Sequence, residues 1–466
     1  MTNEEFRKHG YQVIDWIADY LKNIEQYPVK SQVSPGEIMD SLPDRPPAKP
    51  EPFDLIMNDL DEKIMPGVTH WQHPGFHAFF NANNSYPSIL AEALTAGMGI
   101  QGMIWETSPA AAELEEQVME WFKQMMSLPK DWTGVIQDTA STATLAALLS
   151  AREWKTNYEI NEKGFHSERL RVYCSAETHS SIEKGVKIAG FGKSNLVKIP
   201  VKDDQSMDVA LLEKRVIEDL TNGYTPCIIV STQGTTGTLA VDHVESIGRI
   251  AKKYNIWHHV DAAWAGNTFI LSEFQHYTRG FDKVDSFVFN PHKWLFTNFD
   301  CSAYFVKSKD ILLNTFEILP EYLKTGTRGK VNDYRDWGIP LGRRFRALKL
   351  WFVIRSYGVE GLQKKLRRHV KWAKWLEQQV IAHSHFELMA TNRFSTVILR
   401  YNPGNLDEKQ LNARNKAILA SINKEGKAYV THTKINHSYV IRVNIGGTYT
   451  EFGHVEKIWQ ILKKNI

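Results

Sequence analysis

The sequence is poor in cysteine and contains no long apolar run. Its 466 residues include three cysteines, Cys174, Cys227 and Cys301, which are far apart and form no CxxC pair. Such cysteines are typical of small buried side chains in a reducing compartment, and a catalytic thiol is the weaker alternative. No stretch approaches the roughly 18 uninterrupted apolar residues of a membrane span, and the first residues lack the apolar core of a signal peptide. We therefore expect a cytoplasmic protein with no membrane association.

The chain also lacks a concentration of charge of either sign. Lys and Arg number 56 against 53 Asp and Glu, so the net charge is +3, and both signs are interspersed. A nucleic-acid-binding protein normally carries a concentrated basic face, and this class is therefore not favoured. Hydrophobic residues make up 42% of the chain and charged residues 23%, as in ordinary globular proteins. The length allows two or three domains with substantial cores.

The composition divides the chain into an expected N-terminal helical arm (1–84), a large domain (85–360) and a small C-terminal α+β domain (361–466). In the arm, apolar residues recur at helical spacing over 13–24. Residues 34–52 are rich in proline, which excludes a helix interior or a central strand. An arm with little core of its own suggests a partner surface, and the simplest partner is a second copy of the chain.

In the large domain, short β-rich runs alternate with helical segments. This alternation predicts a mostly parallel α/β sheet that helices cover on both faces. Ligands of such sheets bind at the carboxyl ends of the strands. The expected strands are 170–174, 196–199, 226–232, 256–260, 286–289 and 302–306.

A lysine and an aspartate come after two of these strands. Lys293 lies in the run 290–294 (Asn-Pro-His-Lys-Trp), and Asp261 follows strand 256–260 directly. The pKa of a lysine falls readily on burial, which is why desolvated lysines form Schiff bases. An aspartate can hold a protonated heterocyclic nitrogen. A Schiff-base lysine with such a partner is the signature of pyridoxal phosphate (PLP) chemistry.

Other segments supply the remaining parts of a phosphate-plus-ring site. Small and hydroxyl residues at 139–144 open a helix, and a helix N-terminus suits a phosphate group. His179 lies beyond a strand end, where it can stack flat on an aromatic ring. Taken alone, the first segment also fits a plain Thr/Ser helix cap, and His179 also fits an ordinary loop. Together with Lys293, Asp261 and the turn 235–238, these two features form a coherent site for a phosphate group and an aromatic ring.

Several longer motifs resemble group II PLP-dependent decarboxylases of the aromatic-L-amino-acid decarboxylase family. They include residues 64–71, 179–181, 259–263, 289–303 and 341–346, and the resemblance covers nearly the whole chain. It implies a fold-type I, PLP-dependent transferase-like fold and a homodimer with active sites at its interface. The implied reaction converts an aromatic L-amino acid to the arylalkylamine and carbon dioxide.

The resemblance also implies residue roles. Lys293 would form the Schiff base with PLP, Asp261 would bind the pyridinium nitrogen, His179 would stack on the ring, and Tyr322 would protonate the former Cα. Further cofactor contacts are expected from Ala140, Ser141, Thr236, Ala263, Asn290 and His292. The substrate pocket is expected from Trp71, Phe79, Phe80, Ala82, Met103, Phe299 and Gly342, with Met103 reaching it from the neighbouring subunit.

Two positions bear on the product and the substrate. Tyr322 predicts an amine, because a phenylalanine in this place is linked in the family to oxidative deamination into an aldehyde. Gly342 matches the glycine of indole-accepting plant relatives, which favours tryptophan and leaves tyrosine, dopa and phenylalanine open. The chain departs from animal members at 81–82, at Met103 and at Trp264, and these departures bear on substrate choice.

The nearest alternatives are an aromatic aldehyde synthase and a decarboxylase of another amino acid class. An acidic substrate would need a cation for its second carboxylate, whereas the segment around Trp71, Phe79 and Phe80 offers rings. A metal hydrolase would need a carboxylate or cysteine at zinc-site spacing near the clustered histidines His70, His73 and His77, and the sequence offers none. A basic helix at 364–371 fits a solvated face better than a membrane or partner surface.

Overall fold

The computed structural model describes residues 1–318, 326 and 329–466. They form two compact units. The first unit combines residues 1–81 with 371–389 and 395–466, and the second combines residues 82–370 with 390–394. The first unit thus draws on both ends of the chain, and the division into three domains at 84 and 360 stays a prediction.

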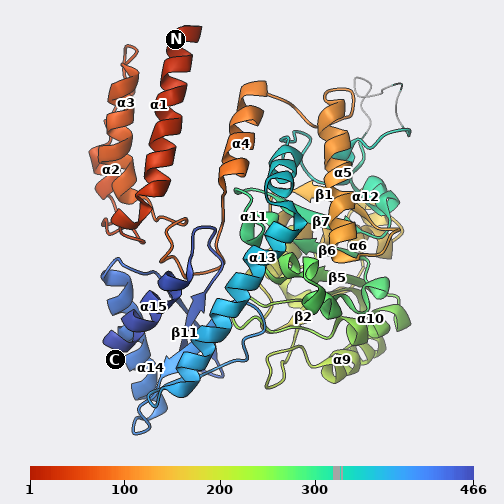
Figure 1. Ribbon diagram of the computed structural model, residues 1–466. Helices are drawn as coiled ribbons and strands as arrows, with labels where there is room; N and C mark the ends of the chain where they lie inside the picture. The colour runs from red at the N-terminus through yellow and green to blue at the C-terminus, as the bar shows by residue number, and fades with distance from the viewer. Residues whose placement is uncertain (319–325, 327–328) are drawn as a thin grey trace. The chain divides into compact units, whose positions relative to one another are not determined.

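A seven-stranded sheet forms the centre of the second unit (Figure 1). Neighbouring strands from β6 through β5, β4 and β2 to β3 run parallel, whereas β7 is antiparallel to both β6 and β1. The predicted mostly parallel sheet is therefore confirmed. In the order of the sheet, the strands are β1 (Thr133–Gln137), β7 (Ser302–Val306), β6 (Ser286–Phe289), β5 (Trp257–Asp261), β4 (Thr225–Thr232), β2 (Leu170–Ser175) and β3 (Leu196–Ile199).

Helices cover both faces of this sheet, and successive strand residues pack into different cores. Ile228 belongs to a cluster with residues of α6 and α8, whereas Ile229 packs with residues of α9 and α10. Because neighbouring side chains of a strand point to opposite faces, a strand covered on both faces is mostly apolar in both sets of positions. The helices of this unit are α4 (Tyr86–Met98), α5 (Pro109–Met126), α6 (Ala140–Lys155), α7 (Glu159–Lys163), α8 (Ser180–Ile188), α9 (Val209–Thr221), α10 (Val244–Lys253), α11 (Pro291–Trp294) and α12 (Lys309–Phe316).

The long helix α13 (Ala347–Ala382) is interrupted at Gly358, which has a φ of 64°. Glycine adopts this left-handed conformation without the steric cost that a side chain would bring. The part of α13 up to Val370 belongs to the second unit, and the remainder belongs to the first.

An antiparallel four-stranded sheet forms part of the first unit, in the order β10 (Thr431–Ile435), β11 (Ser438–Asn444), β9 (Thr396–Tyr401) and β8 (Phe386–Leu388). It packs with α14 (Glu408–Lys424) and α15 (Phe452–Lys464) into a core that includes Val397, Ile418 and Leu462. The expected small α+β fold is thus present. The N-terminal residues contribute α1 (Asn3–Lys22), α2 (Glu37–Ser41) and α3 (Phe53–Asp59).

The structure also bears on the cysteines and on membrane insertion. Cys174, Cys227 and Cys301 are buried and free, as the sequence predicts. Burial raises the pKa of each thiol to about 12. Within the described ranges, no helix has both the length and the apolar character needed to cross a bilayer.

Candidate active site

Two neighbouring parallel strands bring Asp261 and Lys293 to the same edge of the sheet. Asp261 is the last residue of β5 and pairs with Val288 of β6. Lys293 lies on α11, which begins directly after Asn290 at the end of β6. The Asn290 backbone N–H donates to the Ala263 carbonyl at 3.0 Å, so the two strand ends are tied together. This is the carboxyl edge at which parallel sheets bind ligands.

The surroundings of the Lys293 amine favour its neutral, nucleophilic form. Burial lowers the pKa of Lys293, and the carboxylate of Asp261 opposes this effect by raising it. Asp261 is itself buried, and its Oδ1 accepts the Ala263 N–H at 3.0 Å, which fixes the orientation of the carboxylate. The amine and the carboxylate therefore act on one another, as the sequence predicts for a Schiff-base lysine and its acidic partner.

Asn290 and His292 flank the lysine, and the structure fixes both side chains. The Nδ1 atom of His292 accepts the Cys301 N–H at 2.9 Å, so in the neutral ring the proton is on Nε2. Burial lowers the pKa of His292 to about 3, which keeps the ring neutral at physiological pH. Asn290 accepts a hydrogen bond on Oδ1 from Ser302 Oγ at 2.8 Å. The Asn290 side-chain NH₂ group and the His292 Nε2–H are thus both oriented as hydrogen-bond donors.

The start of α6 lies close to Asn290, with Ser302 between them. Thr139 caps this helix by accepting the Thr142 N–H on its side chain. The hydroxyl of Ser302, which contacts Asn290, also lies 3.3 Å from the Asp138 carbonyl. Ala140 and Ser141 occupy the first turn, where backbone N–H groups have no acceptor within the helix and can bind an anion.

His179 caps α8 with its ring. The Nδ1 atom accepts the Ser181 N–H at 3.1 Å. Desolvation lowers the pKa of His179, Asp261 opposes this effect, and Lys293 adds to it. The ring is therefore held in place and neutral, and it is within electrostatic reach of both central residues. These properties suit a ring that stacks on a cofactor.

Thr236 is exposed in the turn after β4. The start of this turn is fixed to the site, because the Gln233 N–H donates to the Asp261 carbonyl at 2.8 Å. The buried Asp242 accepts the N–H groups of Thr232 and Met207, both at 2.7 Å. Burial raises the pKa of Asp242 to about 6.

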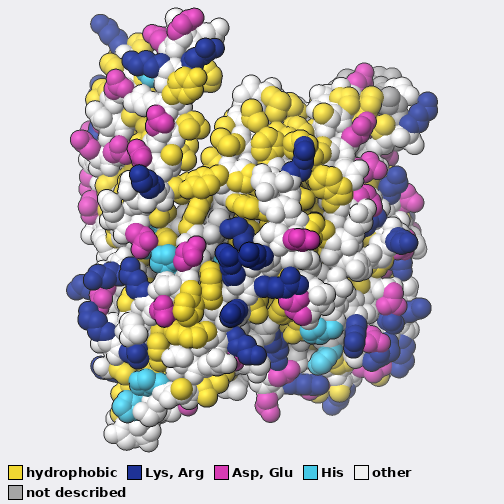
Figure 2. All heavy atoms as spheres, viewed as in Figure 1, with side chains coloured by type: hydrophobic (Ala, Val, Ile, Leu, Met, Phe, Trp, Pro, Cys, Tyr) yellow, Lys and Arg dark blue, Asp and Glu magenta, His cyan; other side chains and the backbone are white. Residues whose placement is uncertain are grey.

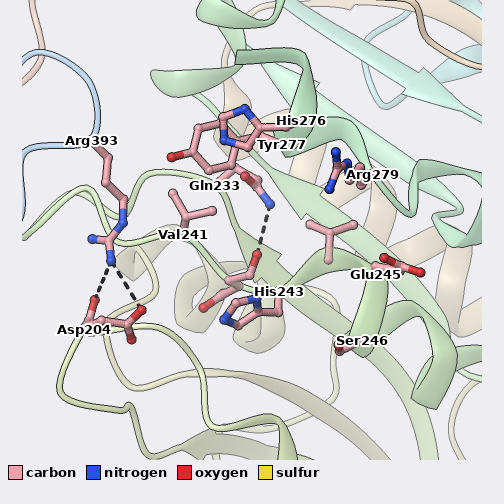
Figure 3. A pocket seen from close by; sticks show the side chains of 12 residues that line it. Asp204, Gln233, Val241, His243, Glu245, Ser246, His276, Tyr277, Arg279 and Arg393 are labelled. Atoms are coloured by element: carbon pink, nitrogen blue, oxygen red, sulfur yellow. Dashed lines mark hydrogen bonds and ion pairs between the residues drawn. The ribbon is translucent and has the colours of Figure 1, made fainter. Parts of the chain in front are cut away.

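A cavity of about 320 Å³ lies beside this turn, and Figure 3 shows the side chains that line it. The Gln233 amide donates to the Asp242 carbonyl at 3.1 Å, and Arg393 pairs with Asp204 at 3.3 Å. His243, His276 and Arg279 also line it. None of the predicted site residues is among its described lining, so this hollow is distinct from the Lys293 site.

The predicted substrate-binding residues are divided between the two units. In the first unit, Trp71 stacks on Phe79 at 5.8 Å between centroids, and Arg442 lies over the ring of the buried Phe80. In the second unit, Phe299 is exposed and contacts the His292 ring edge-on at 4.8 Å. Their assembly into one pocket stays a prediction.

Three further predicted residues lie in the second unit, and one lies outside the described residues. A Cβ atom on Gly342 would approach the Gln101 amide nitrogen to 3.1 Å, so this position is tight toward Gln101. The Met103 carbonyl accepts the Arg335 N–H at 3.0 Å, and Ala82 is half-buried. Tyr322 belongs to the segment that the structure does not describe.

Ser302 was not predicted as a site residue, although it joins Asn290 to the start of α6. Its position follows from strand pairing. Phe289 pairs with Ala303 in the antiparallel β6–β7 ladder, so the next residues outward, Asn290 and Ser302, meet. Sequence alone could have found it only if this antiparallel pairing had been recognised.

These donors, the Lys293 amine and the Asp261 carboxylate fit PLP in kind. The cofactor carries an aldehyde for an unprotonated amine, a ring nitrogen for a carboxylate and a phosphate for N–H donors. Each of these groups has a counterpart at one edge of the sheet, and the sheet has the strand arrangement expected for fold type I. The molecule is therefore a PLP-dependent enzyme.

Comparison with known proteins defines this class more closely. The conserved domain of pyridoxal-dependent decarboxylases matches residues 35–402, and the chain belongs to that family. It is thus a PLP-dependent carboxy-lyase, and the resemblance seen in the sequence motifs is confirmed.

Relatives match over the full chain. Tyrosine decarboxylase 3 of Petroselinum crispum is 42% identical, covering 99% of this chain and 91% of its own length. Phenylacetaldehyde synthase of Arabidopsis thaliana is also 42% identical, with coverage of 100% and 96%. The crystal structure of Catharanthus roseus tryptophan decarboxylase in complex with L-tryptophan superposes with a TM-score of 0.94 at 40% identity, covering 100% of this chain and 98% of that one.

Proposed function

We propose that the protein decarboxylates an aromatic L-amino acid, with tryptophan favoured, to the corresponding arylalkylamine. The observation that carries this proposal is the Lys293 amine, whose pKa burial lowers beside the buried carboxylate of Asp261. The full-length similarity to plant tyrosine and tryptophan decarboxylases supports the aromatic substrate class. Tyrosine, dopa and phenylalanine remain alternative substrates.

The residues of the site have separable roles in this proposal. Lys293 would bind the cofactor covalently and yield it to the substrate amine, and its lowered pKa favours the unprotonated amine that this exchange requires. Bound PLP supplies an electron sink for the pair that remains at Cα when carbon dioxide leaves. Asp261 would keep a proton on the ring nitrogen, and His179 would hold the ring from one face.

The phosphate would be held from several elements at once. The first turn of α6 at Ala140 and Ser141 offers backbone N–H groups, and Asn290 and His292 add side-chain donors. Thr236 would contribute from the turn after β4, and Ala263 fixes the backbone beside Asp261. An anchor made of separate strand ends restricts rotation of the ring, so the bond to be broken is held in a defined direction.

Tyr322 would complete the reaction by giving a proton to Cα. This step separates the proposed activity from that of an aldehyde synthase, and the similarity to phenylacetaldehyde synthase makes the latter the second candidate. A tyrosine at 322 favours the amine, because a hydroxyl acid is available at the position where a phenylalanine has none.

The test is to incubate the PLP-loaded protein separately with tryptophan, tyrosine, dopa, phenylalanine and glutamate, and to identify the products by mass spectrometry. The expected result is an amine from aromatic substrates, lost in Lys293→Ala, without stoichiometric ammonia or peroxide. Aldehyde as the main product would mean that the role of Tyr322 is wrong. Turnover of glutamate alone would mean that the aromatic pocket is wrong.

The protein is also expected to act as a homodimer with active sites at the interface. In support, one face of α4 presents Tyr86, Leu90, Leu94 and Met98 at four-residue spacing, each 49–55% exposed. Figure 2 shows apolar side chains gathered over this helix. Exposed apolar stripes of this kind favour a protein partner. The exposed Phe6 and Tyr11 of α1 support the proposal that the N-terminal arm contacts a second copy of the chain.

The three buried, free thiols support a cytoplasmic location.

The dimer can be tested on the α4 face. Replacing both Leu90 and Leu94 with lysine is expected to lower the molar mass found by light scattering from two chains to one. A Leu211→Lys change on α9, which is exposed but lies outside the stripe, serves as the matched control. A wild-type protein that is active as a monomer would refute the proposal.

A further inference from the structure

Two buried tryptophan rings stack beside the Lys293 turn, and a buried histidine lies edge to edge with one of them. Trp264 and Trp294 are stacked at 4.7 Å between centroids with an interplanar angle of 13°. His369 of α13 is coplanar with Trp294 to within 1°. The Trp294 Nε1–H donates to His369 Nδ1 at 2.9 Å. The two tryptophans are fully buried, and His369 is nearly so.

The stack connects the two residues that carry the proposed chemistry. Trp264 is three residues after Asp261, and Trp294 directly follows Lys293 on the four-residue helix α11. A helix this short has almost no internal hydrogen bonding, so its orientation depends on what it packs against. A displacement of the Trp294 ring would therefore move the Lys293 backbone relative to β5.

The protonation state and the tautomer of His369 suit the hydrogen bond from Trp294. Burial, together with the positive charges of Lys365 and Arg368, lowers the pKa of His369 to about 3, so the ring is neutral. A neutral imidazole has one acceptor nitrogen, and the Trp294 N–H requires that this be Nδ1. Phe296 packs edge-on against the same ring at 5.9 Å, which restricts its rotation.

We propose that His369 is a positioning residue for Lys293: by accepting the Trp294 indole hydrogen bond within the Trp264–Trp294 stack, it sets the direction of α11 and thereby the placement of the lysine amine beside Asp261. The inference rests on the proposed function of Lys293 as the cofactor-binding lysine. It adds a residue that touches neither substrate nor cofactor.

Removal of the acceptor leaves a buried indole N–H without a partner. Such a group is costly in a dry interior, so the Trp294 ring is expected to shift toward another acceptor or toward water. The stack and the lysine turn would move with it. In His369→Phe, we expect PLP to bind about tenfold more weakly to the cofactor-free protein, within the range expected for one lost buried hydrogen bond.

The test compares His369→Phe, His369→Asn, Trp294→Phe and the double variant Trp294→Phe/His369→Phe. The asparagine Oδ1 atom corresponds roughly to histidine Nδ1, so His369→Asn keeps an acceptor where His369→Phe has none. Cofactor affinity is measured by quenching of the tryptophan fluorescence of the cofactor-free protein. The pH midpoint of the absorbance band of the lysine-bound cofactor is a second readout, and thermal unfolding identifies variants that merely fail to fold.

The expected result has three parts. His369→Phe weakens PLP binding and shifts the pH midpoint of the absorbance band, whereas His369→Asn restores both toward the wild type. Once Trp294 is phenylalanine, His369→Phe has little further effect, because the hydrogen bond is already absent. His385→Phe, an exposed histidine-to-phenylalanine change, leaves both readouts unchanged.

Two results would overturn the inference. One is a folded His369→Phe protein whose affinity and pH midpoint equal those of the wild type. The other is an effect of His369→Phe that is undiminished in the Trp294→Phe background. Borohydride reduction followed by peptide mapping separates this inference from the proposed function. If the cofactor is not found on Lys293 in the wild type, both fail; if it is found there and the variants behave like wild type, only the role of His369 fails.

Discussion

Replacing Asp261 with asparagine removes one negative charge from the centre of the site and changes its shape little. The carboxylate is buried at the end of β5, and its Oδ1 accepts the Ala263 N–H at 3.0 Å. An asparagine carbonyl can accept the same hydrogen bond, so the local backbone should be retained. What the variant loses is the partner that would hold a proton on the cofactor nitrogen.

The magnitude follows from the burial of this charge. Leaving one member of a buried ion pair without its partner costs about 3–5 kcal/mol. At 1.36 kcal/mol per tenfold change in rate, this corresponds to a fall in kcat of about 10²–10⁴-fold. The variant should also show an effect before any cofactor is added. Because Asp261 raises the pKa of Lys293, its removal should lower the pKa of the amine further, and the amine should react with acylating reagents at lower pH.

The assay measures kcat on the preferred aromatic substrate with saturating PLP, together with the pH dependence of Lys293 acylation in the cofactor-free protein. Asp285→Asn is the matched control: this carboxylate also accepts a backbone N–H, from His258 at 2.8 Å, but it precedes β6 and so lies at the opposite edge of the sheet. We expect it to retain wild-type kcat. An Asp261→Asn protein with cofactor bound and kcat within about threefold of the wild type, well below the range expected for a lost buried charge, would refute the reasoning.

Further predictions concern the substrate, the product and the effect of pH. Gly342→Ser should lower the kcat/KM ratio of tryptophan to tyrosine by about tenfold, within the range for a pocket altered by about one small group; its added Cβ, 3.1 Å from Gln101, must be accommodated by that amide, and an unchanged ratio would contradict the prediction. In the presence of oxygen as the oxidant, Tyr322→Phe should convert the main product from amine to aldehyde, with release of ammonia and hydrogen peroxide; amine formation at the wild-type rate would exclude Tyr322 as the acid. Stability should fall between pH 6.5 and pH 5, because burial lowers the pKa of His258, His259, His292 and His369 to about 3. A histidine with a lowered folded pKa contributes its stability above the unfolded pKa and loses it below, by about 2 kcal/mol each at pH 5. Urea unfolding of the wild type at the two pH values, compared with His259→Gln, measures this loss, and equal stability at both would contradict it.

Most strands of the large sheet were predictable because they are buried on both faces. The six expected strands agree with the observed ones to within one residue at each end, since continuous apolar runs such as 226–232 have few other interpretations. β1 (Thr133–Gln137) was not predicted as a strand. It is short and opens with a threonine and a glycine, and Gly134 packs where a Cβ would meet Met119 and Phe305, so its place in the sheet depends on tertiary packing.

The small sheet was only half predictable. β9 and β11 contain continuous apolar runs that are buried, and such runs indicate strands from sequence alone. β10 (Thr431–Ile435) alternates half-buried and exposed residues at the edge of the sheet, and β8 has three residues, so neither has a strong pattern of its own. Their pairing with β11 and β9 supplies what local sequence does not.

The site was predictable where chemistry and strand ends coincide, as for Asp261 and Lys293, and unpredictable where support comes from distant segments. His369 lies in α13, 76 positions beyond Lys293, within a basic helix that reads from sequence as a solvated face. Its burial and its bond to Trp294 depend on how the second unit packs. A single histidine in a basic segment gives no local signal of such a contact.

The position of Trp264 changes what its departure from the animal family members means. From sequence, a tryptophan that replaces a tyrosine so close to Asp261 bears on substrate choice. The structure buries the Trp264 ring completely against Trp294, so the larger side chain fills space behind the lysine turn and has no exposed surface to offer a substrate. A change at Trp264 should therefore alter cofactor affinity and the placement of Lys293 before it alters the preference between aromatic rings. We expect substrate choice to depend instead on positions such as Ala82, Met103 and Gly342, where the side chain is not fully buried or is absent.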